Sequence, residues 1–196
     1  MSDSAARHRA RQTIVNLVLA LAASVALVVV IVITLPRDES NRIKPVAYDS
    51  IVAQAASSSG LDLIKVKPLE NWWCNLAQLN LTSADAVPNF KAGFVGSNTK
   101  YLGYTQAFGG NPTWLAFQLK EKTLTGTFEY SYYKWDIYQS VVKNDPAKTM
   151  DYIMVLNYKN DNYVLLYGVA DKTEYEAFAK EISDRLKKAS SIDQTN

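Results

Sequence analysis

A run of 22 residues without a charged side chain, residues 14–35, is the feature that most constrains how this chain can fold. Its polar members are Asn16, Ser24 and Thr34. Because a helix rises about 1.5 Å per residue, a helix of this length spans the roughly 30 Å hydrocarbon core of a bilayer. The sequence therefore predicts one transmembrane helix close to the N-terminus.

The charges on either side of this run predict its orientation. Three arginines lie in residues 7–11, whereas residues 37–39 on the far side read Arg-Asp-Glu. Since Lys and Arg gather on the cytoplasmic side of a span, we expect residues 1–13 to form a cytoplasmic tail and the later part to be extracytoplasmic. A cleaved signal peptide is the alternative, but the run exceeds an h-region and no small-x-small cleavage pattern follows it. An uncleaved signal-anchor in the cell membrane is favoured.

The net charge of +2 belongs to the predicted tail. The chain has 21 Lys+Arg and 19 Asp+Glu; the tail holds three arginines and Asp3, so that 18 residues of each sign remain outside it. Nucleic-acid-binding domains carry a basic patch or stripe that neutralises phosphates. A neutral outer domain therefore predicts no nucleic-acid partner and weak attraction to anionic headgroups.

The cysteine and histidine counts exclude further classes of protein. Cys74 and His8 are the single residues of their types, too few for a disulfide or a Cys/His zinc module. With His8 in the tail, the outer domain has no histidine base for nucleophilic catalysis. Cys74 has no cationic neighbour in sequence to lower its pKa, so we expect a buried structural thiol. We predict no catalytic residue, cofactor or metal site; an enzyme would need a carboxylate pair in a cleft.

The part after the span divides into a linker and one domain. Residues 36–45 are polar and bracketed by prolines, as is typical of a short exposed linker. A linker of this length holds the following domain near the membrane surface. We expect that domain to cover residues 46–190, followed by a C-terminal tail at residues 191–196.

Apolar periodicity predicts the elements of this domain. A short helix is expected from Tyr48 to a stop at residues 57–60, and an amphipathic helix with a capping-box-like start over residues 173–189. Residues 113–120 fit a short helix or irregular structure. Strands are expected at residues 63–67, 72–81, 127–139, 150–158 and 163–170, and a hairpin around residues 96–99.

Three details of these strands can be tested. In residues 72–81, the side chains expected to share one side are Trp73, Ala77, Leu79 and Leu81. The aromatic stretch 127–139 changes face at residues 132–133, which indicates a bulge. Residues 150–158 and 163–170 are apolar on both faces, as central strands covered on each side are.

Together these elements predict an α+β fold, in which a mainly antiparallel sheet of six or seven strands carries packed helices. Strand follows strand without the regular βαβ alternation that would favour a parallel sheet.

Several short motifs in residues 45–189 occur in a characteristic order. They are Trp72-x-x-Asn75-x-Ala77-x-Leu79, Gly93-Phe94-Val95 with Tyr101 and Gln106 in the next arm, Trp135, and Gly168-x-Ala170. In this order, behind an anchor, they resemble the actinobacterial family catalogued as domain of unknown function 4245. The chain departs from it at Phe90, where the family tends to have Trp, and at Gly96-Ser97, where it tends to have Thr-Pro. The resemblance implies an actinobacterial envelope protein and brings no catalytic residues.

Aromatic residues suggest where partners bind. The chain has 12 Tyr, 4 Trp and 6 Phe, and 12 tyrosines are more than a core of this size readily hides. The predicted interaction surface consists of Tyr130, Tyr132, Tyr133, Trp135 and Tyr138. In the span, the small residues Ala20, Ala23 and Ser24 are the predicted helix-packing face, since helices in lipid associate through small side chains.

These features lead to two hypotheses of different class. The first is a non-catalytic, membrane-anchored accessory subunit of a larger actinobacterial membrane complex, with the respiratory cytochrome supercomplex as a candidate and integral membrane subunits as partners. The alternative is an extracytoplasmic binding module whose aromatic cleft holds a lipid or cell-wall ligand. A pocket lined by the predicted aromatics favours the module, and a solid core with flat aromatic patches favours the subunit.

Overall fold

The computed structural model describes residues 3–34, 44–82, 86–97, 100–140, 151–159 and 161–193. Contacts within the chain divide it into two compact units, residues 1–42 and 43–196, and each is described by itself below. Of the predicted linker, residues 36–43 lie outside the described part of the chain.

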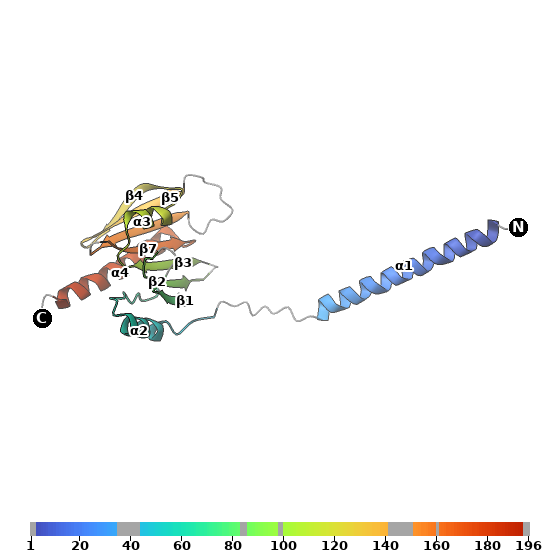
Figure 1. The fold of residues 1–196 in the computed structure, drawn as a ribbon, viewed down its shortest axis with the longest axis horizontal. Coiled ribbons are helices and arrows are strands. Elements are labelled where there is room, and N and C mark those ends of the chain that lie inside the picture. The colour runs from blue at the N-terminus through green and yellow to red at the C-terminus, as the bar shows by residue number, and fades with distance from the viewer. Residues whose placement is uncertain are drawn as a thin grey trace. The chain divides into compact units, whose positions relative to one another are not determined.

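The N-terminal unit contains helix α1, Asp3–Thr34 (Figure 1). Within it, residues 14–31 have a mean hydropathy of 2.9 and are long and apolar enough to cross a membrane, and none of them is buried by the rest of the chain. A helix that is apolar all round and uncovered needs an apolar medium around it. The predicted apolar helix is confirmed, whereas its orientation and its retention in the mature protein stay predictions.

The second unit is built on one seven-stranded antiparallel sheet of order β1-β2-β3-β7-β6-β5-β4. With α1 in front, it confirms the predicted α+β fold. Strands β6 and β7 lie in the interior of the sheet, as their two apolar faces indicated. The strands are β1 (Trp73–Asn80), β2 (Asn89–Val95), β3 (Tyr101–Ala107), β4 (Lys122–Tyr130), β5 (Tyr133–Ser140), β6 (Tyr152–Tyr158) and β7 (Asn162–Gly168).

Helices pack against both faces of this sheet (Figure 1). On one face lie α2 (Tyr48–Ser59) and α4 (Lys172–Asp193), which enclose the larger core with residues such as Phe94, Trp135 and Phe178. On the other face, the short α3 (Pro112–Gln118) packs Trp114 against β6 and β7 over a smaller core. Asn111 caps α3, because its Oδ1 accepts a hydrogen bond from the Trp114 N–H at 2.8 Å.

Helix α4 follows the prediction closely. Its stripe of Tyr175, Phe178, Ile182 and Leu186 is buried in the larger core. At its start, the Asp171 N–H donates to the Glu174 carboxylate at 2.8 Å, which confirms this half of the capping box. The helix continues four residues beyond the expected end at Ala189, to Asp193.

Residues 63–67 are not a strand of the sheet, which corrects the prediction. Ile64 and Val66 are buried in alternation with outer neighbours, and that alternation is the signal that resembles a strand. Side chains replace the neighbouring strand: the Ile64 N–H donates to Gln106 Oε1 at 2.8 Å, and the Val66 N–H to the Tyr48 hydroxyl at 3.1 Å. The segment is thus inserted into the core without a backbone ladder.

The aromatic stretch 127–139 is two strands joined by a turn, and the predicted bulge at residues 132–133 is wrong. Tyr130 pairs with Tyr133 across a two-residue loop, Ser131-Tyr132, and Ser131 has a φ of 57°. A positive φ at the first loop position is what the primed turns of tight hairpins require. Tyr130 and Tyr133 lie directly opposite each other in the hairpin, so their side chains are on the same face of the sheet although they are three residues apart in the sequence. In one continuous strand that spacing would put them on opposite faces, and the sequence therefore resembles a strand with a bulge.

A bulge occurs instead in β1, where the pairing with β2 shifts between Cys74 and Leu76. The extra residue is Asn75, and it places Trp73 opposite Val95 while Ala77 and Leu79 keep to the other face. The prediction that Trp73 shares a side with those two residues is therefore wrong. Trp73 and Leu76 instead share the face that α2 and α4 leave uncovered.

Candidate interaction surface

Aromatic side chains at the β4–β5 turn meet a polar stripe of α4. On that helix, Lys180, Asp184 and Lys187 recur at the i, i+4, i+7 spacing that puts side chains on one face. The Lys180 ammonium lies 5.9 Å from the centre of the Phe128 ring and 5.8 Å from that of Tyr130. We call Phe128, Tyr130, Tyr132, Lys180, Asp184 and Lys187 the hairpin surface.

The tip of the hairpin is held by the same helix. Lys187 Nζ lies 5.5 Å from the centre of the Tyr132 ring, and the Tyr130 hydroxyl donates to Asp184 Oδ2 at 3.4 Å. Tyr132 is nevertheless 85% exposed. Cation–π contacts at exposed sites contribute about 0.5–1 kcal/mol each, enough to favour one position of a ring that nothing covers. The hairpin surface therefore presents a large aromatic group in a restrained position.

The five predicted aromatics do not form one surface. Trp135 is completely buried, and its indole N–H donates to the Ser183 hydroxyl at 3.2 Å, so it belongs to the core. Tyr133 is half-buried against the same core, whereas Tyr138 packs on the smaller core across the sheet. Alternation along β5 is the physical reason, because successive side chains of a strand point to opposite faces. Tyr130 and Tyr132 remain as members of the hairpin surface.

In the N-terminal helix, Ala20, Ala23 and Ser24 are all exposed and lie within the apolar segment 14–31. The Ser24 hydroxyl donates to the Ala20 carbonyl at 3.0 Å. A hydroxyl satisfied within its own helix can enter an apolar medium at little cost. Their predicted role as a helix-packing face stays a prediction.

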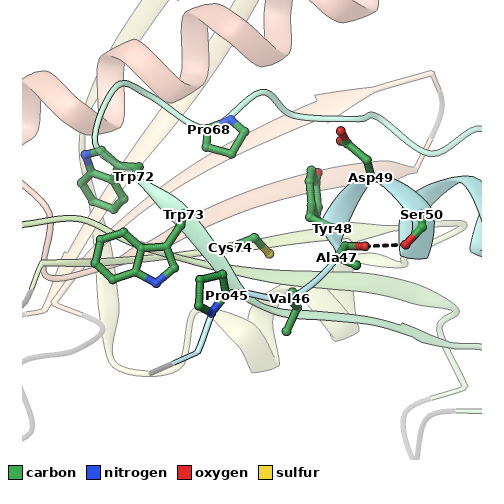
Figure 2. Close-up of a pocket in the computed structure, with 10 residues that line it drawn as sticks. All are labelled: Pro45, Val46, Ala47, Tyr48, Asp49, Ser50, Pro68, Trp72, Trp73 and Cys74. Carbon is green, nitrogen blue, oxygen red and sulfur yellow. Dashed lines mark hydrogen bonds between the residues drawn. The ribbon is translucent and has the colours of Figure 1, made fainter. Parts of the chain in front are cut away.

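A groove of about 520 Å³ lies where the chain enters the second unit (Figure 2). We call it the tryptophan groove. The segment leading into α2 forms one wall, and the start of β1 forms the other. Its lining residues are Pro45, Val46, Ala47, Tyr48, Asp49, Ser50, Pro68, Trp72, Trp73 and Cys74. None of the five predicted aromatics is among them.

The two indoles of this groove have different surroundings. Trp73 is 36% exposed and lies beside Pro45, and Trp72 points to the other side of the chain (Figure 2). There Trp72 packs edge-on against Phe178 of α4, with ring centres 5.3 Å apart. A Val46 N–H to Cys74 carbonyl hydrogen bond of 2.9 Å joins the two walls. Trp73 is therefore the more accessible indole of the groove.

Ionisable groups of the groove are paired or buried. Asp49 forms an ion pair of 2.9 Å with Lys65, and both side chains are exposed. Burial raises the pKa of the Tyr48 hydroxyl and of the Cys74 thiol, whose Sγ donates to the Leu76 carbonyl at 3.0 Å. A raised pKa keeps this thiol protonated at neutral pH, and the protonated form is a poor nucleophile. Within the described ranges, no three His, Cys, Asp or Glu residues gather as a metal site.

Gln106 is at the centre of a polar network that sequence reasoning did not find. Its Oε1 accepts from the Ile64 N–H at 2.8 Å and from the Tyr104 hydroxyl at 2.9 Å. Its amide nitrogen donates to the Asp62 carbonyl at 2.8 Å and to the Tyr158 hydroxyl. All four hydrogen-bonding positions of the amide are thus used, and the backbone partners fix its orientation. The network attaches the inserted segment to the sheet.

Other residues of the quoted motifs also have packing roles. A Cβ at Gly93 would lie 2.6 Å from Asn75 Oδ1 and 3.0 Å from the Tyr101 ring, so the absence of a side chain admits both. Gly168 has a φ of 145°, and a Cβ there would lie 2.2 Å from the Tyr101 carbonyl oxygen. Backbone positions of this kind are open to glycine and to few other residues. Gly93 therefore makes room for side chains of β1 and β3 on either side of β2, and Gly168 allows β7 to approach β3 closely.

The fold and surfaces define a class of protein with one apolar N-terminal helix followed by an antiparallel α+β domain. The family model described as "Protein of unknown function (DUF4245)" matches residues 9–182, and the chain belongs to this family. No curated protein and no solved structure matches the chain.

Proposed function

We propose that this protein is a non-catalytic accessory subunit of a larger membrane complex, anchored by α1 and docked through its hairpin surface. The observation that carries the proposal is Tyr132, 85% exposed yet restrained by Lys187. Tyrosine is enriched where proteins bind one another, because it offers a large contact area with few rotatable bonds. Holding the ring in advance reduces the entropy lost on binding.

The anchor supplies the second part of the proposal. Residues 14–31 have the length and hydropathy of a membrane span, and the arginines of residues 7–11 favour a cytoplasmic N-terminus. With this orientation the second unit is extracytoplasmic. The small residues Ala20, Ala23 and Ser24 would then let α1 pack closely beside the helices of an integral membrane partner.

The position of the aromatic residues favours a subunit over a ligand-binding module. A module for a lipid or cell-wall glycan would line a cleft with the predicted aromatics, and those residues instead lie in one of the two cores or on the hairpin surface. We further propose that the partner complex belongs to an actinobacterial envelope, with the respiratory cytochrome supercomplex as a candidate.

Purification of the crosslinked protein from the membranes of its own host tests the proposal. A C-terminally tagged full-length chain, extracted in mild detergent, should bring down integral membrane subunits in stoichiometric amount. Tyr132→Ser should reduce that recovery at least tenfold. Phe117→Ser is the matched control, because Phe117 is a 73% exposed aromatic residue on α3. Recovery of the chain alone, or equal losses with both variants, contradicts the proposal.

A further inference from the structure

In the sequence, few residues separate the tryptophan groove from the predicted span. Ten residue steps separate Leu35, the last residue of the apolar run, from Pro45 at the rim of the groove. An extended chain covers at most about 3.6 Å per residue, so that ten steps reach about 36 Å. With α1 in the bilayer, the length of the chain keeps the groove within that distance of the membrane surface.

The exposed groups beside the groove suit the boundary between lipid and water. The bulge at Asn75 puts Trp73 and Leu76 on the same face of β1, and they are 36% and 43% exposed. Tryptophan favours the headgroup region of membranes, since its ring is apolar and its N–H is polar. Pro45 lies next to the Trp73 ring (Figure 2). An apolar patch that belongs to an edge strand is therefore available to a lipid surface.

The charges of the groove favour a neutral lipid surface over an anionic one. The carboxylate that lines it, Asp49, is paired with Lys65 at 2.9 Å. Attraction to anionic lipid takes a cluster of Lys or Arg, and the lining holds neither residue type. Burial of apolar area would thus stabilise the contact between the groove and the lipid surface, and salt would change the strength of this contact little.

From these observations we propose that the domain rests on the outer surface of the bilayer through the rim of the tryptophan groove, with Trp73 and Leu76 at the headgroup level. This inference rests on the anchoring part of the proposed function and adds a second contact, with lipid. Strands β1 and β4 are the two edges of the sheet, six strand spacings or roughly 29 Å apart. The hairpin surface, at the β4 edge, is then presented away from the lipid and towards the extramembrane part of a partner.

Quenching of tryptophan fluorescence by brominated phosphatidylcholine tests the contact. The full-length protein is placed in nanodiscs of this lipid, with bromines just below the headgroups, and compared with unbrominated discs. Of the four tryptophans, Trp114 and Trp135 are buried in the two cores and serve as internal references. We expect the brominated lipid to remove up to about a quarter of the emission.

Substitutions assign the quenching to one side chain. Trp73→Phe should abolish most of it, whereas Trp72→Phe should preserve most of it, because Trp72 is the less exposed indole and packs against Phe178. Leu76→Ser should at least halve it, and the matched control Phe117→Ser should leave it unchanged. High salt and added anionic lipid should have no effect. Absence of quenching, equal quenching in Trp73→Phe, or dependence on anionic lipid overturns the inference.

Other occupants of the groove give different results. A second copy of the chain would give a concentration-dependent dimer that Trp73→Phe weakens. A single bound lipid or glycan would give one stoichiometric ligand in native mass spectrometry. Either result without quenching by the bilayer overturns the inference. The pull-down separates this failure from that of the proposed function. Trp73→Phe should retain the partner subunits that Tyr132→Ser loses.

Discussion

Two neighbouring stripes of helix α4 both contact aromatic residues, but one stripe buries its aromatic partner and the other leaves its partner exposed. The apolar stripe, with Phe178 and Ile182, seals Trp135 completely, and Ser183 satisfies its indole N–H. The polar stripe, with Lys180 and Lys187, contacts the half-buried Tyr130 and leaves Tyr132 85% exposed. Aromatic content alone therefore does not locate a binding surface, because the neighbouring element decides between burial and exposure.

Substitution of Trp135, which the apolar stripe of α4 covers, should have the largest effect on stability. Trp135→Ala removes the largest fully buried side chain and its hydrogen bond to Ser183, and should lower the free energy of unfolding by about 4 kcal/mol. Urea unfolding of the purified protein, followed by far-ultraviolet circular dichroism, measures this. A loss below about 1 kcal/mol would contradict the assignment of Trp135 to the core.

Next in size is the loss of the buried amide. Gln106→Ala leaves the buried Ile64 N–H and the buried Tyr104 hydroxyl without their partner, and an unsatisfied buried group costs about 1–3 kcal/mol. We expect a destabilisation of about 3 kcal/mol and faster hydrogen exchange at the Ile64 amide. Gln78→Ala, on the exposed side of β1, is the control and should change stability by less than about 0.5 kcal/mol. Equal effects of the two substitutions would show that the network contributes nothing.

The sequence could predict the long regular elements of the fold, and it could not predict contacts that depend on one distant side chain. Hydrophobic periodicity located α1, α4 and the central strands, because a long regular pattern fixes the type of an element. It failed for residues 63–67 and at Asn75, where one distant side chain or one inserted residue decides the structure. Which of the candidate aromatics are exposed was equally beyond reach, since the partner of Tyr132 lies 55 residues further along, at Lys187.

Alkaline pH should lower the stability of the protein through the buried tyrosines of the larger core. Burial raises the pKa of Tyr158 to about 12, although its hydrogen bond with Gln106 lowers it in part, against about 10 in an unfolded chain. Between these pH values the unfolded state has lost the hydroxyl proton that the native state keeps. The contribution of Tyr158 to stability is therefore fully present below about pH 10 and is lost as the pH rises towards about 12. The loss from this residue is on the order of 2 kcal/mol. Unfolding free energies measured from pH 9 to 12 should show this fall, reduced in Tyr158→Phe; a flat profile would contradict it.

Two tyrosines of β6 allow a matched test of buried hydroxyl groups. The Tyr158 hydroxyl accepts a hydrogen bond from Gln106, whereas the buried Tyr152 hydroxyl has no partner among the residues described. Tyr158→Phe should therefore cost about 1 kcal/mol, and Tyr152→Phe should be neutral or slightly stabilising. Chemical unfolding at neutral pH compares the two variants. The reverse order would mean that Tyr152 has a partner in the folded protein.

The smallest effect on stability is expected at Tyr132, the exposed residue beside the polar stripe of α4. Tyr132→Ala removes one exposed ring and its contact with Lys187, and should lower the free energy of unfolding by about 0.5 kcal/mol, the lower end of the range for an exposed cation–π contact. Lys187→Ala should have an equally small effect, and the double variant tests whether the two changes are coupled. Because a ring that is already exposed gains little from folding, its role must be sought in partner recovery. A cost of 2 kcal/mol at Tyr132 would instead place it with Trp135 as a structural residue and remove the argument for a docking surface.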